Sequence, residues 1–301
     1  MQTREYSFKW RDLIIAVVGG DDREQEIARL AGLSGANIRA SGFPWPEGGI
    51  SSVDHFEKPE GAMRGADIVL MPIPGIAADG SIFADQKIIP RADLLSLMAS
   101  PAHIILGKAD MGLVEAARQT GVTLHEYEHD NELMLLRGPA IVEAVLQVLI
   151  TNTDITLHGA NICIIGQGNI GSLLTNCLVK LGAHVTVAAR NPVQLALAYT
   201  MGASPLPLTQ FAEQAGRFDI IVSTVPAPVV TSQIVDALPS HALVVDISAP
   251  PGGCDLDYVK SSGRKGIWAR ALGRRAPITV GGSQWVGISK IIDTILEGQI
   301  K

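Results

Sequence analysis

The 301-residue chain has few of the residues that mark several large protein classes. It contains three cysteines, no CxxC pair, and only 5% aromatic residues. An odd number of widely spaced cysteines argues against a disulfide framework and is typical of a reducing compartment. Cys163 and Cys177 are expected to be small buried hydrophobes. A low aromatic content suits α/β layers whose cores are filled by valine, isoleucine, leucine and alanine.

Basic charge and long apolar runs are also scarce. The net charge is −6, with 24 Lys and Arg against 30 Asp and Glu, and no basic stripe is present. This balance argues against a nucleic-acid-binding protein. No apolar stretch reaches the roughly 18 residues needed to span a bilayer, and Met1–Tyr6 lacks the apolar core of a signal peptide. We therefore predict a cytoplasmic protein with no membrane partner.

The strongest motif is Gly166-Gln167-Gly168-Asn169-Ile170-Gly171. An apolar run (162–165) precedes it, and a helical pattern (170–181) and a second apolar run (185–188) follow. A GxGxxG motif in this strand–turn–helix–strand context is strong evidence for a dinucleotide site. Gly166 would permit the tight turn, Gly168 would let a pyrophosphate approach, and Gly171 would let the helix pack closely. The helix N-terminus at Asn169 and Ile170 would offer N–H groups to the phosphates. The alternative is a glycine-rich turn without a ligand.

The end of the second strand indicates which dinucleotide binds. It reads Ala188-Ala189-Arg190-Asn191 and lacks the carboxylate that usually bonds the ribose hydroxyl of NAD. The planar guanidinium of Arg190 matches the geometry of a 2′-phosphate. We predict NADP bound near Arg190 and Asn191, with NAD as the alternative. Otherwise Arg190 is a solvated residue at a strand end.

The order of apolar patterns predicts an α/β protein with two Rossmann-like, doubly wound parallel-sheet domains. We expect a cleft between them and long inter-domain helices. The predicted parts are a substrate or partner domain (1–136), a connecting helix that Pro139 starts (137–152), an NADP-binding Rossmann domain (153–280), and a C-terminal helix returning to the first domain (281–301). The stretch 42–61 is rich in glycine and proline and is predicted to be loop.

Individual elements follow from the same periodicity. Strands are expected at 13–18, 37–41, 68–71, 103–106, 122–124, 162–165, 185–188, 220–222 and 243–245. Helices are expected at 24–33, 111–120, 170–181 and 285–296. Ligands bind beyond the carboxyl ends of parallel strands. Thr224, Pro226 and Ser248 follow two such strands, so we expect them to border the nicotinamide half of the cofactor.

A second loop, Gly19-Gly20-Asp21-Asp22-Arg23, follows the first predicted strand. Two carboxylates beside the turn would repel a pyrophosphate, so we predict a substrate loop. Arg23 would hold a substrate carboxylate, because arginine binds carboxylates bidentately. Asp21 would orient Arg23 or take a proton. The alternative is a solvated helix N-terminus whose acids favour the helix dipole.

The stretch 125–130, His-Glu-Tyr-Glu-His-Asp, matches no zinc spacing. In an extended strand, neighbouring side chains point to opposite faces. We therefore expect a solvated strand end and no metal site. Glu128 remains a candidate catalytic residue, with Asp130 beside it.

Further motifs are spread over essentially the whole chain: Val18 to Asp21 with Arg23 and Glu26; Glu128 with Asp130; Thr153-Asp154, Thr156 and His158-Gly159; Pro251-Gly252-Gly253 with Asp255 and Tyr258; and Ala276-Pro277 with Thr279 and Gln284. Together they resemble the A subunit of dipicolinate synthase from spore-forming bacteria. Arg274-Arg275 and Gly281-Gly282-Ser283, the latter resembling a small insertion, depart from the pattern.

The resemblance implies formation of dipicolinate (pyridine-2,6-dicarboxylate) from a dihydrodipicolinate-type intermediate, with hydride transfer to NADP. It also implies a small dicarboxylate substrate, a partner in the form of a flavoprotein-like B subunit, and the cytoplasm of the mother cell in a sporulating bacterium. A homo-oligomer is expected. Two other readings stay open. One is another two-domain NAD(P)-dependent dehydrogenase for a 2-hydroxy or 2-amino acid. The other is a nucleotide-binding subunit that is inactive without its partner.

Overall fold

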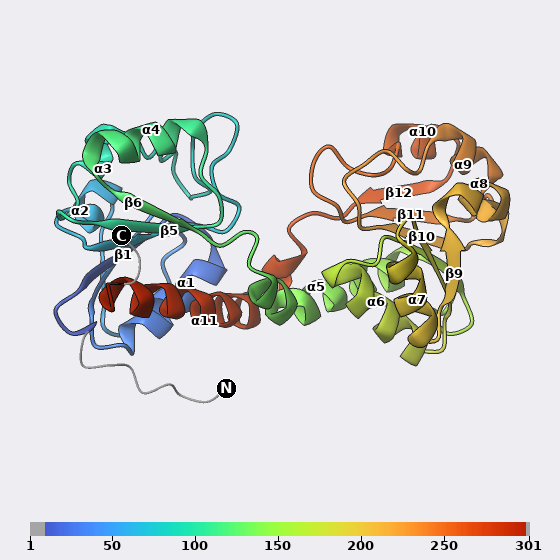
Figure 1. Ribbon diagram of the computed structural model, residues 1–301, viewed down its shortest axis with the longest axis horizontal. Helices are drawn as coiled ribbons and strands as arrows, with labels where there is room; N and C mark the ends of the chain where they lie inside the picture. Colours follow the sequence, from blue (N-terminus) through green and yellow to red (C-terminus); the bar gives the residue numbers. More distant parts are fainter. Residues whose placement is uncertain (1–9, 299–301) are drawn as a thin grey trace. The chain divides into compact units, whose positions relative to one another are not determined.

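The computed structural model describes residues 10–298, so the expectation for Met1–Tyr6 falls outside the described residues. The chain divides into two compact units. The first contains the chain up to Leu136 together with the chain from Ala276 onward, and the second is Arg137–Arg275. Each unit is an open parallel sheet with helices on its faces (Figure 1).

The sheet of the first unit has six strands in the order β3-β2-β1-β4-β5-β6. The strands are β1 (Ile14–Val18), β2 (Asn37–Ser41), β3 (Val53–His55), β4 (Ile68–Leu70), β5 (His103–Leu106) and β6 (Thr123–Glu126). The helices of this unit are α1 (Asp22–Gly32), α2 (Pro59–Met63), α3 (Ala92–Leu95), α4 (Met111–Thr120) and α11 (Pro277–Leu296).

The sheet of the second unit has the order β12-β11-β10-β7-β8-β9. Its strands are β7 (Asn161–Ile165), β8 (His184–Ala189), β9 (Ser204–Pro207), β10 (Ile220–Ser223), β11 (Leu243–Asp246) and β12 (Lys265–Trp268). Its helices are α6 (Asn169–Lys180), α7 (Pro192–Thr200), α8 (Phe211–Gln214), α9 (Ser232–Ala237) and α10 (Leu256–Ser261), with short 3₁₀ turns at Leu208–Gln210, Ala215–Arg217 and Leu272–Arg275.

Both sheets have the strand order of a Rossmann fold, which confirms the predicted doubly wound architecture. In each sheet the chain order reverses in the middle, between β1 and β4 and between β7 and β10. Loops from these two central strands diverge at the carboxyl edge of the sheet, which is where open α/β sheets bind ligands. The topology therefore places one candidate site in each unit.

Apart from Asn161 and Ser223 at strand ends, the central strands are apolar, because both faces of each sheet are covered. In β7, Ile162 and Ile164 join the hydrophobic cluster on one face, and Cys163 and Ile165 join the cluster on the other. Cys163 is fully buried, as its position in an apolar strand predicts, and burial raises the pKa of its thiol above the usual value. The thiol is therefore protonated and fills core space.

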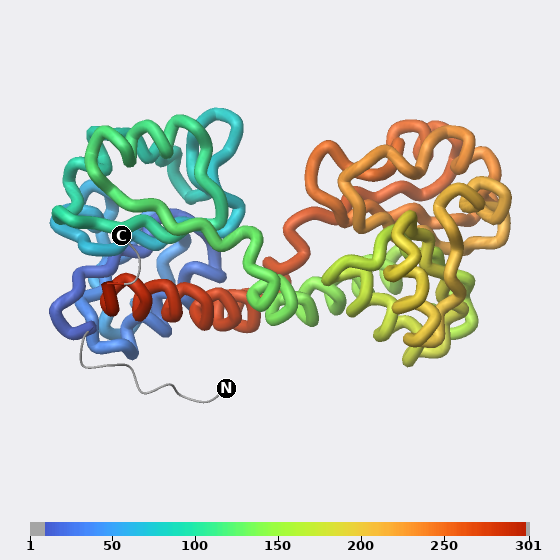
Figure 2. Tube along the Cα trace, in the orientation of Figure 1, coloured from blue at the N-terminus to red at the C-terminus, as the bar shows by residue number. Residues whose placement is uncertain are grey.

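The last helix, α11, packs against α1 in the first unit, and Figure 2 shows these two segments side by side. The indole rings of Trp10 and Trp285 meet edge to face with centroids 5.8 Å apart. The Trp10 Nε1–H donates to Asp293 Oδ1 at 2.9 Å. A methyl group at Gly281 would lie 2.6 Å from the Arg23 carbonyl oxygen, so the absence of a side chain allows the close approach of the helices. The segment 281–283 is thus part of α11.

Two sequence predictions need correction. The helix α5 (Asn131–Asn152) does not start at Pro139, which lies inside it. Asp130 bonds the backbone N–H groups of Glu132 and Leu133 and so begins the helix earlier. The stretch 42–61 is not all loop, because β3 pairs with the edge of β2 and α2 begins at Pro59.

Among residues 10–298, α5 is the one helix long and apolar enough, by length and composition alone, to cross a membrane. The sequence expectation missed it because Arg137 and Glu143 interrupt the apolar run. Val145 and Leu149 of α5 are fully buried in the hydrophobic cluster of the second unit. A core helix passes the same test, so this feature alone is weak evidence for a membrane span.

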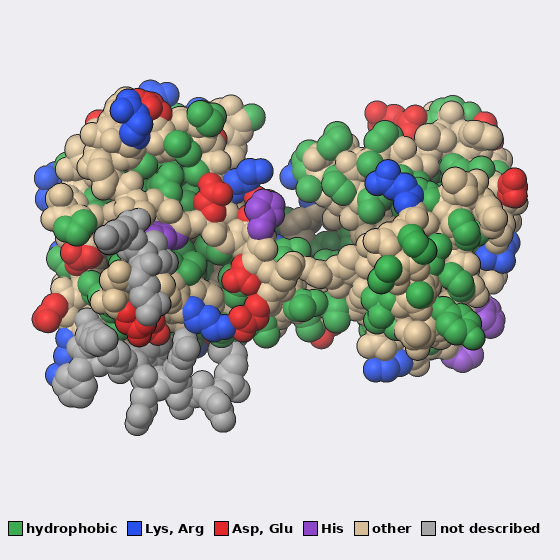
Figure 3. Space-filling view, in the orientation of Figure 1, with side chains coloured by type: hydrophobic (Ala, Val, Ile, Leu, Met, Phe, Trp, Pro, Cys, Tyr) green, Lys and Arg blue, Asp and Glu red, His purple; other side chains and the backbone are tan. Residues whose placement is uncertain are grey.

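The surface of α7 is unusually apolar. Val193 and Tyr199 are more than 70% exposed, and the helix contains no charged residue. Figure 3 shows hydrophobic side chains on the face of the second unit that carries α6 and α7. The expected oligomer and partner contacts stay predictions.

Gly281→Ala is expected to destabilise the first unit by about 1–3 kcal/mol. The added methyl group would overlap the backbone of α1, which cannot move away by bond rotation as a side chain can. The gain in helix propensity, about 0.5–1 kcal/mol, is smaller. Gly48→Ala is the control, since nothing lies within 4 Å of the point where its methyl group would stand. Urea unfolding of both variants measures the difference. Equal stability of the two would show that α1 and α11 are not closely fitted.

Candidate functional site

The glycine turn of the second unit lies at the switch point, directly after β7. Gly166 has φ +92°, and a side chain there would meet Thr224 Oγ1 at 2.6 Å. A side chain at Gly171 would meet the Gly166 carbonyl oxygen at 2.3 Å. Nothing lies within 4 Å of the side-chain direction of Gly168. Gly166 and Gly171 are thus required by the fold, whereas Gly168 leaves open space.

The turn leads into the N-terminus of α6. The N-cap residue is Gly168, which has no side chain to bond the helix amides. The first hydrogen bond of the helix runs from Ser172 N–H to the Gly168 carbonyl at 2.9 Å. The amides of the preceding turn, at Ile170 and its neighbours, therefore lie at the positive end of the helix dipole, where anions bind. Asn169 and Ile170 are half-buried there.

A pocket of about 660 Å³ adjoins the glycine turn within the second unit. Its walls include apolar side chains such as Phe211 and Val225, and Arg190 and Asn191 at the end of β8. No Asp or Glu lines it. Arg190 is exposed and has no carboxylate partner within the described part of the chain. Asn191 caps α7 by accepting from Val193 N–H at 2.8 Å, which fixes the end of β8.

The loops after β10 and β11 place the other predicted cofactor residues. Both the backbone N–H and the hydroxyl of Thr224 donate to the Ile165 carbonyl, at 3.0 and 2.9 Å, so Thr224 ties β10 to the start of the glycine turn. Pro226 is exposed in the following loop. The Ser248 hydroxyl donates to Asp246 Oδ1 at 2.6 Å. Ser248 is therefore bonded inside its own loop.

Two buried residues of these loops were given no individual role from the sequence. Asp246 is 1% exposed and also accepts from the Gly253 and Cys254 amides through Oδ2, so it organises the whole segment 246–254. Gln167, in the middle of the glycine motif, is 3% exposed and accepts from the Thr175 hydroxyl at 2.9 Å. A polar residue at the last position of an apolar strand was the available signal for Asp246.

The first unit also has a glycine loop between its first strand and a helix, but a carboxylate occupies the N-terminus of that helix. Gly19 and Gly20 follow β1, with φ of +76° and +116°, and Asp21 takes the N-cap position of α1. This is the position that Gly168 holds before α6. The Asp21 carboxylate accepts from the Arg23 backbone N–H at 3.1 Å, so the chain's own anion fills the helix terminus. That the loop does not bind a pyrophosphate stays a prediction.

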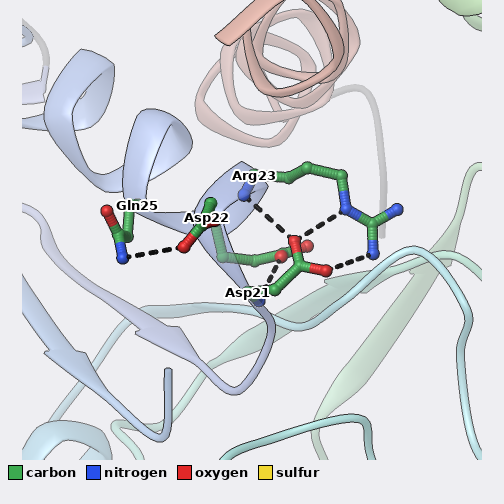
Figure 4. Close-up of polar contacts among 5 residues, drawn as sticks. Asp21, Asp22, Arg23 and Gln25 are labelled. Carbon is green, nitrogen blue, oxygen red and sulfur yellow. Dashed lines mark hydrogen bonds and ion pairs between the residues drawn. The ribbon is translucent and has the colours of Figure 1, made fainter. Parts of the chain in front are cut away.

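Asp21 and Arg23 form a buried ion pair (Figure 4). Arg23 Nε lies 2.8 Å from Asp21 Oδ1 and Nη2 lies 3.1 Å from Oδ2. Burial opposes the charge of Arg23, but the hydrogen bonding of Asp21 and the charges of Glu24 and Asp21 outweigh it and raise the pKa of Arg23 above its usual value. Asp21 and Arg23 are 5% and 8% exposed, so neither is solvated, whereas Asp22 in the first turn is exposed, as the alternative of a solvated helix N-terminus expects.

Glu24 completes this group. Its Oε2 accepts from Asp21 N–H at 2.8 Å, which closes a capping box. Its Oε1 is buried and has no hydrogen-bond partner within residues 10–298. Burial raises the pKa of Glu24 to about 7, although the charge of Arg23 opposes the rise. Sequence reasoning missed Glu24 because a capping glutamate is normally solvated.

Glu128 lies after β6, at the same carboxyl edge of the first sheet. It is half-buried, and its Oε2 lies 4.0 Å from Lys108 Nζ. Lys108 follows β5 and was given no role from sequence. A side chain at Gly107 would lie 1.7 Å from the Ile73 carbonyl oxygen, so the loop after β4 fits tightly against this segment and positions Lys108. Asp130 caps α5 instead of entering the site.

The stretch 125–130 is not simply a solvated strand end. His125 is 8% exposed, and its Nε2 lies 3.0 Å from His103 Nδ1. Burial, with a contribution from His103, lowers the pKa of His125 to about 4. His103 begins β5, at the strand end away from the glycine loop. Within the described residues no cluster of three or more metal-ligating side chains occurs.

Comparison with known proteins gives matches for both units. Residues 14–128 match the family model of the N-terminal domain of the dipicolinate synthase A subunit. Over its length the chain is similar to the A subunit of dipicolinate synthase. The Bacillus subtilis (strain 168) protein is 27% identical, over 89% of this chain and 92% of the relative. The crystal structure of the Bacillus halodurans protein has a TM-score of 0.82 at 27% identity and covers 94% of this chain and 97% of that one.

Other matches concern the second unit and the fold. Residues 149–253 match the shikimate/quinate 5-dehydrogenase model. A transhydrogenase structure from Sinorhizobium meliloti has a TM-score of 0.67 at 16% identity, covering 94% of each chain, which is a likeness of fold alone. Together the matches support an oxidoreductase role with a nicotinamide cofactor.

Gly168→Val is expected to leave the fold intact and to weaken dinucleotide binding about 100-fold, because the side chain enters open space that a pyrophosphate needs. Gly171→Ala is the contrasting variant, since its methyl group meets backbone and should lower the melting temperature. Calorimetric titration with NADP and thermal unfolding are the measurements. Normal affinity in Gly168→Val would show that the turn does not hold the cofactor.

Proposed function

We propose that the protein is an NADP-dependent oxidoreductase that forms dipicolinate from a dihydrodipicolinate-type intermediate. The observation that carries the proposal is the glycine turn beside a pocket that contains Arg190 and no carboxylate. This arrangement fits a dinucleotide with a 2′-phosphate: open space at Gly168, a helix N-terminus without a side-chain cap, and an exposed cation. The whole-length similarity to the A subunit of dipicolinate synthase supports the reaction.

Aromatising a dihydropyridine ring removes one hydride and one proton. The oxidised nicotinamide, when bound, accepts the hydride, and the protein supplies binding, orientation and electrostatics. The ring gains aromatic stability, so a strong base is not required. The two carboxylates of the substrate need cations or N–H donors. The residues proposed for this work are Asp21, Arg23 and Glu128.

Arg23 is the proposed ligand for a substrate carboxylate. Asp21 engages Nε and Nη2 and holds the guanidinium in one orientation. Nη1 takes no part in this pairing, and it is the atom proposed to bond the substrate carboxylate. A cation fixed by its own counter-ion loses little side-chain entropy on binding, which favours affinity. The paired Lys108 and Glu128 provide further charge at the same sheet edge.

The cofactor side involves the glycine turn, with Asn169 and Ile170, and the end of β8, with Arg190 and Asn191. Thr224, Pro226 and Ser248 are proposed to border the nicotinamide. The Thr224 hydroxyl is bonded to the Ile165 carbonyl and the Ser248 hydroxyl to Asp246, so backbone and shape, rather than free hydroxyls, would form this border.

The further proposals are a partner in the form of a flavoprotein-like B subunit, a homo-oligomer, and location in the mother-cell cytoplasm of a sporulating bacterium. The similarity to a protein whose name makes it one part of a synthase supports the existence of a partner. Two alternatives remain distinct: a dehydrogenase for a 2-hydroxy or 2-amino acid, and a nucleotide-binding subunit that is inactive alone. Assays of the chain with and without the partner, using both substrate classes, separate them.

Arg190→Ala is expected to weaken NADP binding by roughly 10- to 150-fold and to leave NAD binding nearly unchanged. The reason is the loss of a charge-assisted contact worth about 1.5–3 kcal/mol. Titration calorimetry with both cofactors measures it, and Arg91→Ala, an exposed arginine in the first unit, is the control. An equal loss for NADP and NAD would refute the assignment, as would tighter NAD binding by the unaltered protein.

Arg23→Ala is expected to lower kcat/KM for the dicarboxylate by roughly 10- to 100-fold, again through loss of a charge-assisted bond. Arg23→Lys should restore it only in part, because a point charge cannot reproduce the fork. NADP affinity should hardly change in either variant. Reduction of NADP, followed by absorbance in the presence of the partner, is the assay.

The control is Arg29→Ala, which alters a half-exposed arginine of the same helix that pairs with Glu26. Thermal unfolding identifies any loss of fold caused by removing the ion pair with Asp21. Unaltered kinetics of a folded Arg23→Ala would remove Arg23 from the proposed site.

A further inference from the structure

Glu24 lies in the first turn of α1 beside the Asp21–Arg23 ion pair. It is 2% exposed, one carboxyl oxygen is bonded to the Asp21 amide, and the other is buried without a partner among the residues that the structure describes. A buried polar atom without a partner is costly, so its presence in a folded protein calls for an explanation. A proton on Oε1 removes the charge that burial disfavours.

The local packing is built around this carboxyl group. A side chain at Gly20 would lie 2.3 Å from Glu24 Oε2, so glycine at position 20 makes the room that Glu24 occupies. A capping box alone requires only the oxygen that accepts the N-cap amide. It does not require the second oxygen to be buried away from water.

The charged groups acting on Glu24 are its two neighbours, Asp21 and Arg23. Asp22 is exposed and bonds Gln25, and Tyr127, after β6, acts on Arg23. Charged residues on the other elements packed against α1 have other partners or are exposed. Arg39 of β2 donates to the Arg64 carbonyl, and Asp54 and His55 of β3 are exposed. In α11, Lys290 bonds Glu132 and Asp293 accepts from Trp10. The charge of the group is therefore set by Asp21, Arg23 and Glu24.

We propose that Glu24 couples proton uptake to the binding of a dicarboxylate at Arg23. With Glu24 ionised, one cation and two carboxylates leave the group with one net negative charge, which repels a dianion. With Glu24 protonated the group is neutral. Binding of the dianion therefore draws one proton from solvent onto Oε1, and release of the ligand returns it. The inference rests on the proposed function, and Glu24 acts as a positioning residue through Arg23.

The sign of the pH dependence follows. Below the Glu24 pKa of about 7 the carboxyl group is already protonated, so affinity does not change with pH. Above it, each binding event must also bind a proton. Affinity is then expected to fall about tenfold per pH unit. The ligand's own carboxyls, with ordinary pKa values near 4, stay ionised over this range.

The experiment is calorimetric titration of the full chain, loaded with NADP, with pyridine-2,6-dicarboxylate in metal-free buffers of different ionisation enthalpy. The unaltered protein should take up close to one proton at about pH 8.5 and almost none at about pH 6. Glu24→Gln should bind with no proton uptake and with a flat pH profile. Glu26→Gln, on the same helix, is the control and should keep the slope.

Each outcome separates the two proposals. A slope that persists in folded Glu24→Gln, or an absence of proton uptake in the unaltered protein, overturns the role of Glu24 and leaves the proposed function intact. Normal NADP binding with no binding of pyridine-2,6-dicarboxylate, the proposed product, at any pH overturns the proposed dicarboxylate site. If Glu24→Gln does not fold, the proton count of the unaltered protein still decides the question.

Discussion

The glycine turns at the two switch points depend on one constraint, which is the geometry of a parallel sheet whose strand order reverses in the middle. Loops from β1 and β4, and from β7 and β10, leave the same edge in opposite directions. The strand must then turn into a helix within a few residues. Gly19, Gly20 and Gly166 meet that requirement through positive φ. Each unit thereby gains a helix N-terminus at its carboxyl edge.

The residue at the N-cap gives the two termini different chemistry. Gly168 has no side chain, so the amides of α6 and the open space before them can face an external anion. Asp21 places its own carboxylate on the corresponding terminus of α1 and pairs with Arg23. The same fold thus provides a helix N-terminus suited to phosphate in the second unit and a buried ion pair at the helix N-terminus in the first. Fold alone would not distinguish them.

Much of the architecture could be predicted because it rests on local patterns. Strands β2 and β5, and helix α4 between its Asp110 cap and Gly121, have the predicted bounds. Strands β9 and β12 were missed, because Pro205 and Pro207 in one and Gly266 in the other break the strand pattern, yet both fit as edge strands. The start of α5 was misplaced because Pro139 suggested a first turn, while Asp130 supplies the cap.

The sequence by itself determined the alternation of strands and helices, the glycine turn, and the lack of a carboxylate near Arg190, because these depend on neighbours a few residues apart. Only the tertiary structure decided the burial of Glu24 and His125 and the engagement of Ser248 by Asp246. The ionisation of a side chain depends on its desolvation and on charges brought close by folding. In the first unit α11, more than 250 residues further along the chain, covers α1. The sequence predicts a C-terminal helix that returns to the first domain, but no local pattern indicates that it packs on α1.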